Sequence, residues 1–167
     1  EDGVIHDASN PGFGVELWDG VQGDDANWTG QGTNTTTEDS GAVKITYNNH
    51  AGGAYIFLKD AHDLNTDLTI GATYKLTYET KVNTGTINWL VRDGAGSSTD
   101  FTCKKAVSNT SFESREIYFV AGATQGAFFA TTAMGSGEIA WIKNISLKKL
   151  NGNPGMTSGN PVFVKLP

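Results

Sequence analysis

The sequence predicts an all-β protein, an antiparallel β-sandwich of the jelly-roll type. Helical periodicity is nearly absent, because no long window carries apolar residues at the i, i+3, i+4 and i+7 positions without interruption by glycine or β-branched residues. Runs rich in β-branched and aromatic residues recur instead, separated by turns of Gly, Asn, Asp and Thr. At 167 residues the chain is long enough for one domain with its own core.

Eight runs have the length and composition of strands. The run from Thr73 is the clearest, because tyrosine, leucine and valine alternate with lysine, threonine and glutamate, as expected for a strand with one core face and one solvent face. Eight strands at this spacing favour a sandwich or jelly roll. The predicted strands are residues 42–47, 53–59, 73–82, 86–92, 100–105, 112–121, 127–133 and 138–150.

The segment between the third and fourth predicted strands resembles a short hairpin loop. It reads Val-Asn-Thr-Gly-Thr over residues 82–86, and Gly85 can supply a backbone conformation that other residues resist. We therefore expect the strands at 73–82 and 86–92 to be antiparallel neighbours.

The last predicted strand, residues 138–150, changes the phase of its apolar side chains. Ile145 continues the face of Trp141 only if Lys143 also turns inward. Burying a lysine without a partner is costly, so the sequence predicts a β-bulge at Lys143 and Asn144.

The two ends of the chain differ in amino-acid composition from its middle. Residues 1–27 form a lead-in rich in Gly, Asp and Asn that could add an edge strand, and residues 28–150 form the sandwich. Residues 151–167 form a linker that ends in an apolar segment, residues 162–164, which we expect to dock on a sheet edge or on a second copy of the chain. The start at Glu1 leads us to expect a mature form or an excised domain.

Charge and apolar content exclude several classes of partner. The chain has 12 Lys and Arg against 18 Asp and Glu, a net charge of −6, whereas binding a phosphate backbone requires clustered cations. No apolar run approaches the length of a membrane span. We expect neither nucleic acid nor membrane as a partner, and we expect the single Cys103 to be a core residue.

Catalytic motifs are absent from the sequence. It has no Gly-x-Ser-x-Gly, no His-Glu-x-x-His and no glycine-rich phosphate loop before a helix. His6, His50 and His62 all lie in loop-like contexts, where we expect surface residues rather than bases. The sequence therefore predicts a protein that is not an enzyme.

Four segments, in this order, resemble carbohydrate-binding modules of families 4, 9 and 22, which are galactose-binding-like jelly rolls. They are Trp28 with Thr29, residues 71–78 (Gly-Ala-Thr-Tyr-Lys-Leu-Thr-Tyr), residues 111–119, and residues 141–147 (Trp-Ile-Lys-Asn-Ile-Ser-Leu). The likeness spans residues 28–150. It implies a jelly roll outside the cell that binds a polysaccharide or glycan without cleaving it.

The resemblance also implies a structural calcium, but the sequence departs from the family there. Many members carry an aspartate beside the ion where this chain has Lys143, and an ammonium can occupy the place of a cation. The spacing Asp63-x-Asn65-x-Asp67 is a second arrangement that could hold calcium, although Leu68 stands where such a loop needs glycine. An Asx-rich turn is the simpler interpretation, and the metal content stays open.

Sugar binding uses flat aromatic rings together with side chains that bond to hydroxyl groups. Tyr55 and Phe57 alternate with aliphatic residues, so they either form an exposed platform or pack in the core. Trp89 lies either in the core or on the exposed face. If Trp89 lies in the core, strand alternation turns Asn88 and Arg92 towards the cleft. The candidate carbohydrate-binding residues are Trp28, Tyr55, Phe57, Asn88, Trp89 and Arg92.

The leading interpretation is a non-catalytic carbohydrate-binding module with a shallow, aromatic-lined cleft. The alternative is a structural, oligomerising or receptor-binding domain of a larger extracellular assembly, such as a virion-associated phage tail spike or fibre. The apolar segment at 162–164 motivates this alternative, because it would serve as a homo-oligomer contact.

Overall fold

A computed structural model describes residues 12–48, 52–93, 101–131 and 135–151, with side chains except at 93, 101–104 and 131. Within these ranges the chain forms strands and no helix, which confirms the predicted all-β class. The strands are β1 (Phe13–Glu16), β2 (Thr29–Gly30), β3 (Thr35–Asp39), β4 (Ala42–Thr46), β5 (Ala54–Leu58), β6 (Thr73–Val82), β7 (Ile87–Asp93), β8 (Phe101–Val107), β9 (Glu113–Val120), β10 (Gly126–Thr131) and β11 (Ile139–Leu150).

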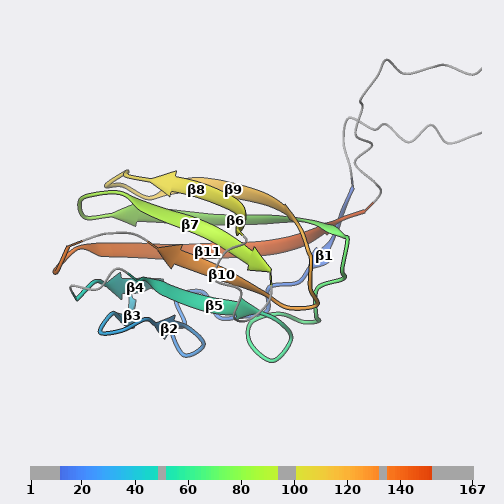
Figure 1. The fold of residues 1–167 in the computed structure, drawn as a ribbon, viewed down its shortest axis with the longest axis horizontal. Coiled ribbons are helices and arrows are strands. Elements are labelled where there is room, and N and C mark those ends of the chain that lie inside the picture. The colour runs from blue at the N-terminus through green and yellow to red at the C-terminus, as the bar shows by residue number, and fades with distance from the viewer. Residues whose placement is uncertain (1–11, 49–51, 94–100, 132–134, 152–167) are drawn as a thin grey trace, which may run out of the picture.

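The described strands form two antiparallel sheets (Figure 1). One has the order β3-β4-β11-β6-β9, with β1 added beside β11, and the other has the order β2-β5-β10-β7-β8. β4 to β11 correspond to the eight predicted strands. The lead-in contributes β1, which lies beside the end of β11 (Figure 1).

The prediction that the strands at 73–82 and 86–92 pair with each other is wrong. β6 pairs with β9 and β11, whereas β7 pairs with β8 and β10, so residues 83–86 cross from one sheet to the other. Gly85 does adopt a positive φ of 74°. Asn83 directs the crossing, because its backbone N–H donates to Ile139 O (2.9 Å) and its Oδ1 accepts from Ile139 N (2.7 Å), which ties the corner to β11.

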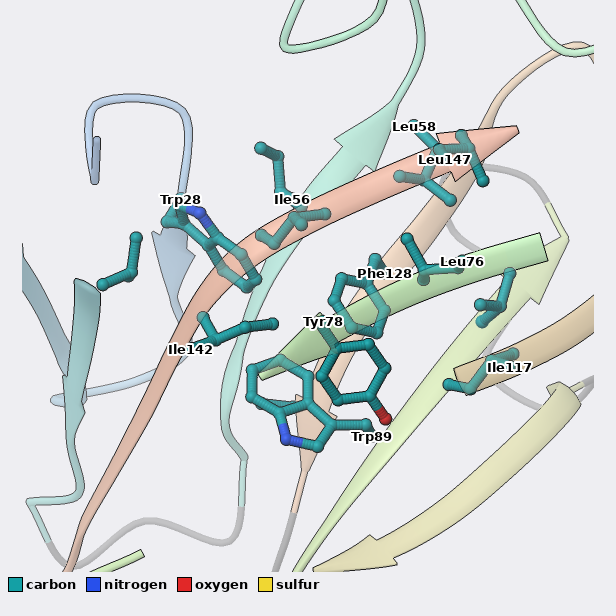
Figure 2. Close-up of a cluster of buried hydrophobic side chains, with 14 of the residues drawn as sticks. Trp28, Ile56, Leu58, Leu76, Tyr78, Trp89, Ile117, Phe128, Ile142 and Leu147 are labelled. Atoms are coloured by element: carbon teal, nitrogen blue, oxygen red, sulfur yellow. The ribbon is translucent and has the colours of Figure 1, made fainter. Parts of the chain in front are cut away.

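The core lies between the inward faces of the two sheets. Three rings form its centre, with ring centroids 4.9 Å apart for Trp89 and Phe128, 5.2 Å for Tyr78 and Phe128, and 5.6 Å for Tyr78 and Trp89 (Figure 2). The indole Nε1 of Trp89 donates to Thr80 Oγ1 at 3.0 Å, which satisfies a polar atom in a fully buried place. Burying each such ring stabilises the fold by about 1.5–3 kcal/mol.

The predicted bulge in β11 is confirmed. The register of β11 against β6 shifts between Lys143 and Ser146, and Asn144 has a positive φ of 51°. Ile142 is buried before the bulge and Ile145 after it, so the extra residue changes which positions face the core. Trp141 consequently lies on the outward face, where its Nε1 donates to Asp39 Oδ2 at 2.9 Å.

Three predictions fall outside what the structure describes. The docking of residues 162–164, and with it the oligomeric assembly, concerns a segment beyond the described residues, and the side chain of Cys103 is likewise outside them. His6 and His50 also lie outside the described ranges.

Candidate functional site

Three aromatic residues form a continuous strip on the outward face of the five-stranded sheet. Phe57 and Tyr55 come from β5 and Phe129 from β10, where it pairs in register with Tyr55. Residues 54, 56 and 58 of β5 are fully buried, so strand alternation turns Tyr55 and Phe57 away from the core. The ring centroids of Tyr55 lie 5.1 Å from Phe57 and 5.8 Å from Phe129. We call these three residues the aromatic strip.

The rings of the aromatic strip differ in orientation and in exposure. Tyr55 and Phe129 are stacked, with planes 20° apart, whereas Phe57 is turned by 72° relative to Tyr55. Phe129 is only 3% exposed, while Tyr55 and Phe57 are half-buried. A ligand can therefore reach Tyr55 and Phe57, and Phe129 supports Tyr55 from the side.

A cation lies over the ring at each end of the aromatic strip. The guanidinium carbon of Arg92 is 4.5 Å from the centroid of Phe129, and Nζ of Lys59 is 5.3 Å from the centroid of Phe57. Arg92 reaches this place from β7, where it pairs with Ala127, itself the register partner of Phe57. The sheet thus places Arg92 on the same outward face as the strip.

Asn88 shares this face as well. It lies two residues from Leu90 on β7, and Leu90 pairs with Phe129 across the sheet. Because side chains two apart on a strand point to one side, Asn88 and Arg92 flank the strip as expected for a core Trp89. The structure thus brings together Tyr55, Phe57, Asn88 and Arg92.

Trp28 and Trp89 are the exceptions among the sequence-predicted site residues. Trp89 is 0% exposed and Trp28 is 6% exposed, and their rings pack edge to face with centroids 6.0 Å apart (Figure 2). Alternation along β7 directs Trp89 inward, and Trp28 packs against Trp89 and Phe128 at the rim of the core. Both rings are therefore occupied by packing, which corrects their inclusion among the residues that contact a ligand.

His62 is a neighbour of the strip that sequence reasoning placed on an ordinary surface loop. Its ring centroid lies 5.5 Å from that of Phe57, and its backbone N–H donates to Lys59 O at 3.0 Å in the turn after β5. Burial lowers the pKa of His62, the charge of Lys59 lowers it further, and Asp63 acts in the opposite direction. The imidazole is therefore neutral at pH 7. The one sequence signal for a position beside Phe57 is that His62 lies in the turn directly after the aromatic strand β5.

The residues near the bulge in β11 do not fit a calcium ion. The ammonium of Lys143 faces outward, 4.2 Å from the ring centroid of Phe112 and 3.7 Å from Glu79 Oε2. On the lead-in side, Glu16 accepts from the backbone N–H groups of Trp18 (3.0 Å) and Leu147 (2.7 Å). Hydrogen bonds and an ion pair thus occupy the oxygen atoms that a hard cation would need.

The Asp63-x-Asn65-x-Asp67 segment does not gather its side chains around one point either. Asp63 Oδ1 accepts from Asn27 Nδ2 at 2.9 Å, and Asp67 Oδ1 accepts from the backbone N–H of Asp60 at 3.3 Å. Asn65 donates to the backbone of the lead-in. In the part of the chain that the structure describes, no three His, Cys, Asp or Glu residues are grouped as a metal site.

The same described residues contain no helix of the length and apolar character that crossing a membrane requires.

Comparison with known proteins finds similarity in structure but not in sequence. No protein-family model matches the chain, and no curated protein matches its sequence significantly. The xylan-binding CBM22-1 domain of Paenibacillus barcinonensis Xyn10C superposes with a TM-score of 0.57 at 9% identity, over 86% of this chain and 97% of that one. The N-terminal cellulose-binding domain of Cellulomonas fimi β-1,4-glucanase C gives 0.56 at 16% identity, over 84% and 100%.

A carbohydrate-binding module of family 29 gives a TM-score of 0.54 at 18% identity, over 82% of this chain and 88% of that one. At such identities the likeness concerns architecture. The chain has the β-sandwich jelly-roll fold of these carbohydrate-binding modules.

Proposed function

We propose that the protein is a non-catalytic carbohydrate-binding module that holds a polysaccharide or glycan against the outward face of its five-stranded sheet. The observation that carries the proposal is the aromatic strip, because two half-buried rings project from a sheet whose opposite face forms the core. Aromatic surface in water favours stacking with the apolar faces of pyranose rings.

Polar side chains beside the strip supply the remaining chemistry. Asn88 carries an amide that can both donate and accept, and Arg92 carries a fork of five N–H donors. Such groups fix the orientation and register of a sugar whose rings stack on Tyr55 and Phe57. An open face with few polar contacts gives weak to moderate affinity, since little of the ligand is enclosed.

The composition of the strip supports binding without cleavage. Glycoside hydrolysis needs two carboxyl groups on either side of the scissile bond. The aromatic strip supplies rings instead, and the residues beside it, Lys59, Asn88 and Arg92, supply an amide and two cations. We place the protein outside the cell, where polysaccharide ligands are found.

Calorimetric titration with a panel of soluble polysaccharides tests this proposal. We expect at least one glycan to bind, and Tyr55→Ala or Phe57→Ala to weaken binding about tenfold or more, as the loss of one stacking ring implies. Tyr118→Ala is the matched control, because Tyr118 is 45% exposed on the other sheet. The proposal would be overturned if the folded protein bound no glycan of the panel, or if Tyr118→Ala weakened binding as much as Tyr55→Ala and Phe57→Ala.

A further inference from the structure

The inference concerns the chemical class of the ligand and rests on the proposed function. Each end of the aromatic strip carries a positive charge: Lys59 lies over Phe57, and Arg92 lies over the buried ring of Phe129. A neutral glycan does not need these charges. We propose that the strip binds an acidic glycan, a chain with uronic acid carboxylates, and that Lys59 and Arg92 receive those carboxylates.

The contrast with the other sheet shows why Lys59 is informative. On that sheet three lysines also lie over aromatic rings, and each has a carboxylate of the protein beside it. Lys75 pairs with Glu116 at 2.8 Å, and Lys143 pairs with Glu79 at 3.7 Å. Lys81, which lies over Phe112 and Trp141, is in no direct ion pair among the described residues, but its charge acts on the carboxylate of Asp39 and helps to lower its pKa. No ion pair joins Lys59 to a carboxylate among the described residues.

Charge complementarity favours an anionic ligand at this place. The chain as a whole carries a net charge of −6, with 12 Lys and Arg against 18 Asp and Glu, so cationic side chains are the minority among its charged groups. The positive charge of Lys59 acts on neighbouring groups, because it contributes to the lowered pKa of His62. A ligand carboxylate beside Phe57 would meet the Lys59 ammonium next to the neutral imidazole of His62.

The geometry also keeps the charges close to where a saccharide would lie. A cation over a ring face is attracted by the electrons of the ring, which keeps the long side chains of Lys59 and Arg92 near the surface of the strip. The planar guanidinium of Arg92 matches the two oxygens of a carboxylate. Because Tyr55 separates the two end rings, the two cations suit carboxylates on different sugars of one chain.

The test titrates the full chain with soluble polyuronates, each paired with its carboxyl-reduced neutral counterpart. The polyuronates are galacturonan, alginate and a glucuronate-substituted xylan, and a neutral glucan is added to the panel. We expect the acidic member of at least one pair to bind tenfold tighter or more than its neutral counterpart. The difference should shrink in 0.5 M salt, because exposed charges are screened there.

Variants locate the charges responsible. Lys59→Gln should remove about tenfold of the affinity for the acidic member and leave the affinity for the neutral one unchanged. Arg92→Gln should weaken the binding of both members, because Arg92 also bonds to hydroxyl groups, and should weaken the binding of the acidic member more. Lys75→Gln is the control, because Lys75 is paired with Glu116 on the other sheet. Thermal unfolding of each variant shows whether it is folded. If Arg92→Gln does not fold, the affinities of Lys59→Gln alone test the proposal.

The outcomes separate the two proposals. Equal or tighter binding of the neutral polymers would overturn the acidic ligand and leave a carbohydrate-binding function standing. Acid-selective binding that neither Lys59→Gln nor Arg92→Gln changes would overturn the assignment to this face. Silence from every polymer, neutral and acidic, would remove the proposed function itself.

Discussion

The side-chain amide of Gln22 makes two hydrogen bonds to the backbone of Ile145, 123 residues later in the chain. Its Nε2 donates to Ile145 O at 2.9 Å, and its Oε1 accepts from Ile145 N at 2.8 Å. Ile145 lies within the bulge of β11, where pairing with β6 is interrupted. The Gln22 amide thus replaces the missing strand partner and joins the lead-in to the last strand.

Gln22→Ala should lower the free energy of unfolding by about 1–3 kcal/mol, because it leaves a part-buried N–H and C=O of Ile145 without their partners. Denaturant titration measures the change. The control is Gln31→Ala, since Gln31 is half-buried and its side chain makes no hydrogen bond among the described residues. Equal losses in the two variants would show that the contact with Ile145 contributes little.

A second prediction concerns the hydrogen bond between Trp89 and Thr80 in the core. Thr80→Val keeps the shape of the side chain but removes the acceptor of the Trp89 N–H, in a place where both residues are 0% exposed. An unsatisfied buried donor costs about 1–3 kcal/mol. Thr77→Val, on the outward face of the same strand, should change stability by about 0.5 kcal/mol or less. Chemical denaturation of the two valine variants compares them directly, and a smaller loss in Thr80→Val would contradict the assignment.

Asp63 provides a prediction that depends on pH. Burial raises the pKa of its carboxyl group, and Asp24 and Asp19 raise it further, against the opposing hydrogen bond from Asn27. The folded protein therefore binds a proton at this carboxylate more readily than the unfolded chain, in which the group has its ordinary pKa of 3.8. Above the raised pKa the ionised group destabilises the fold, and this penalty is lost as the pH falls towards 3.8.

Asp63→Asn removes the charge and keeps an oxygen that can accept from Asn27 Nδ2. The isosteric side chain also keeps its place against Gly20, where a Cβ would come within 2.5 Å of Asp63 Cγ. We expect the variant to melt at a higher temperature than the parent protein at pH 7, and the gap to narrow as the pH approaches 4. Melting curves from pH 4 to pH 7 test this, and a parent protein that is equally stable at pH 7 would contradict it.

Local patterns in the sequence predict the strands well where one face is apolar. The alternation in β6 and the costly inward turn of Lys143 were enough to predict a strand and a bulge. β3 was not predicted, because its sequence, Thr-Thr-Thr-Glu-Asp, has no apolar alternation at the edge of its sheet. β2 has only two residues and gives no pattern at all.

Pairing between distant segments explains what the sequence could not predict about the site. Phe129 joins the aromatic strip because β10 lies between β5 and β7, and nothing in the local pattern of β10 states which strands flank it. The wrong pairing of β6 with β7 has the same origin, since a short loop with a glycine serves both a hairpin and a crossing between sheets. Residues on one strand, such as Tyr55 and Phe57, need only alternation to be placed together.

The bulge residue Asn144 gives a final prediction, on backbone conformation. Asn144 has a φ of 51°, and its Nδ2 donates to Glu79 Oε1 at 2.9 Å at the protein surface. Asn144→Gly loses this hydrogen bond but relieves the backbone, so we expect stability within about 1 kcal/mol of the parent protein. Asn144→Val loses the same bond and forces a β-branched residue into the left-handed region, which costs about 1–2 kcal/mol more.

The matched control makes the same two substitutions at Thr77, which lies within β6 in ordinary extended backbone. There the order should reverse, because valine suits a strand and glycine weakens it. Denaturant unfolding of the four variants therefore separates conformation from side-chain loss. If Asn144→Val proves as stable as Asn144→Gly, the left-handed residue is not what sets the bulge, and the phase change in β11 must come from Gln22 and the backbone of Ile145 instead.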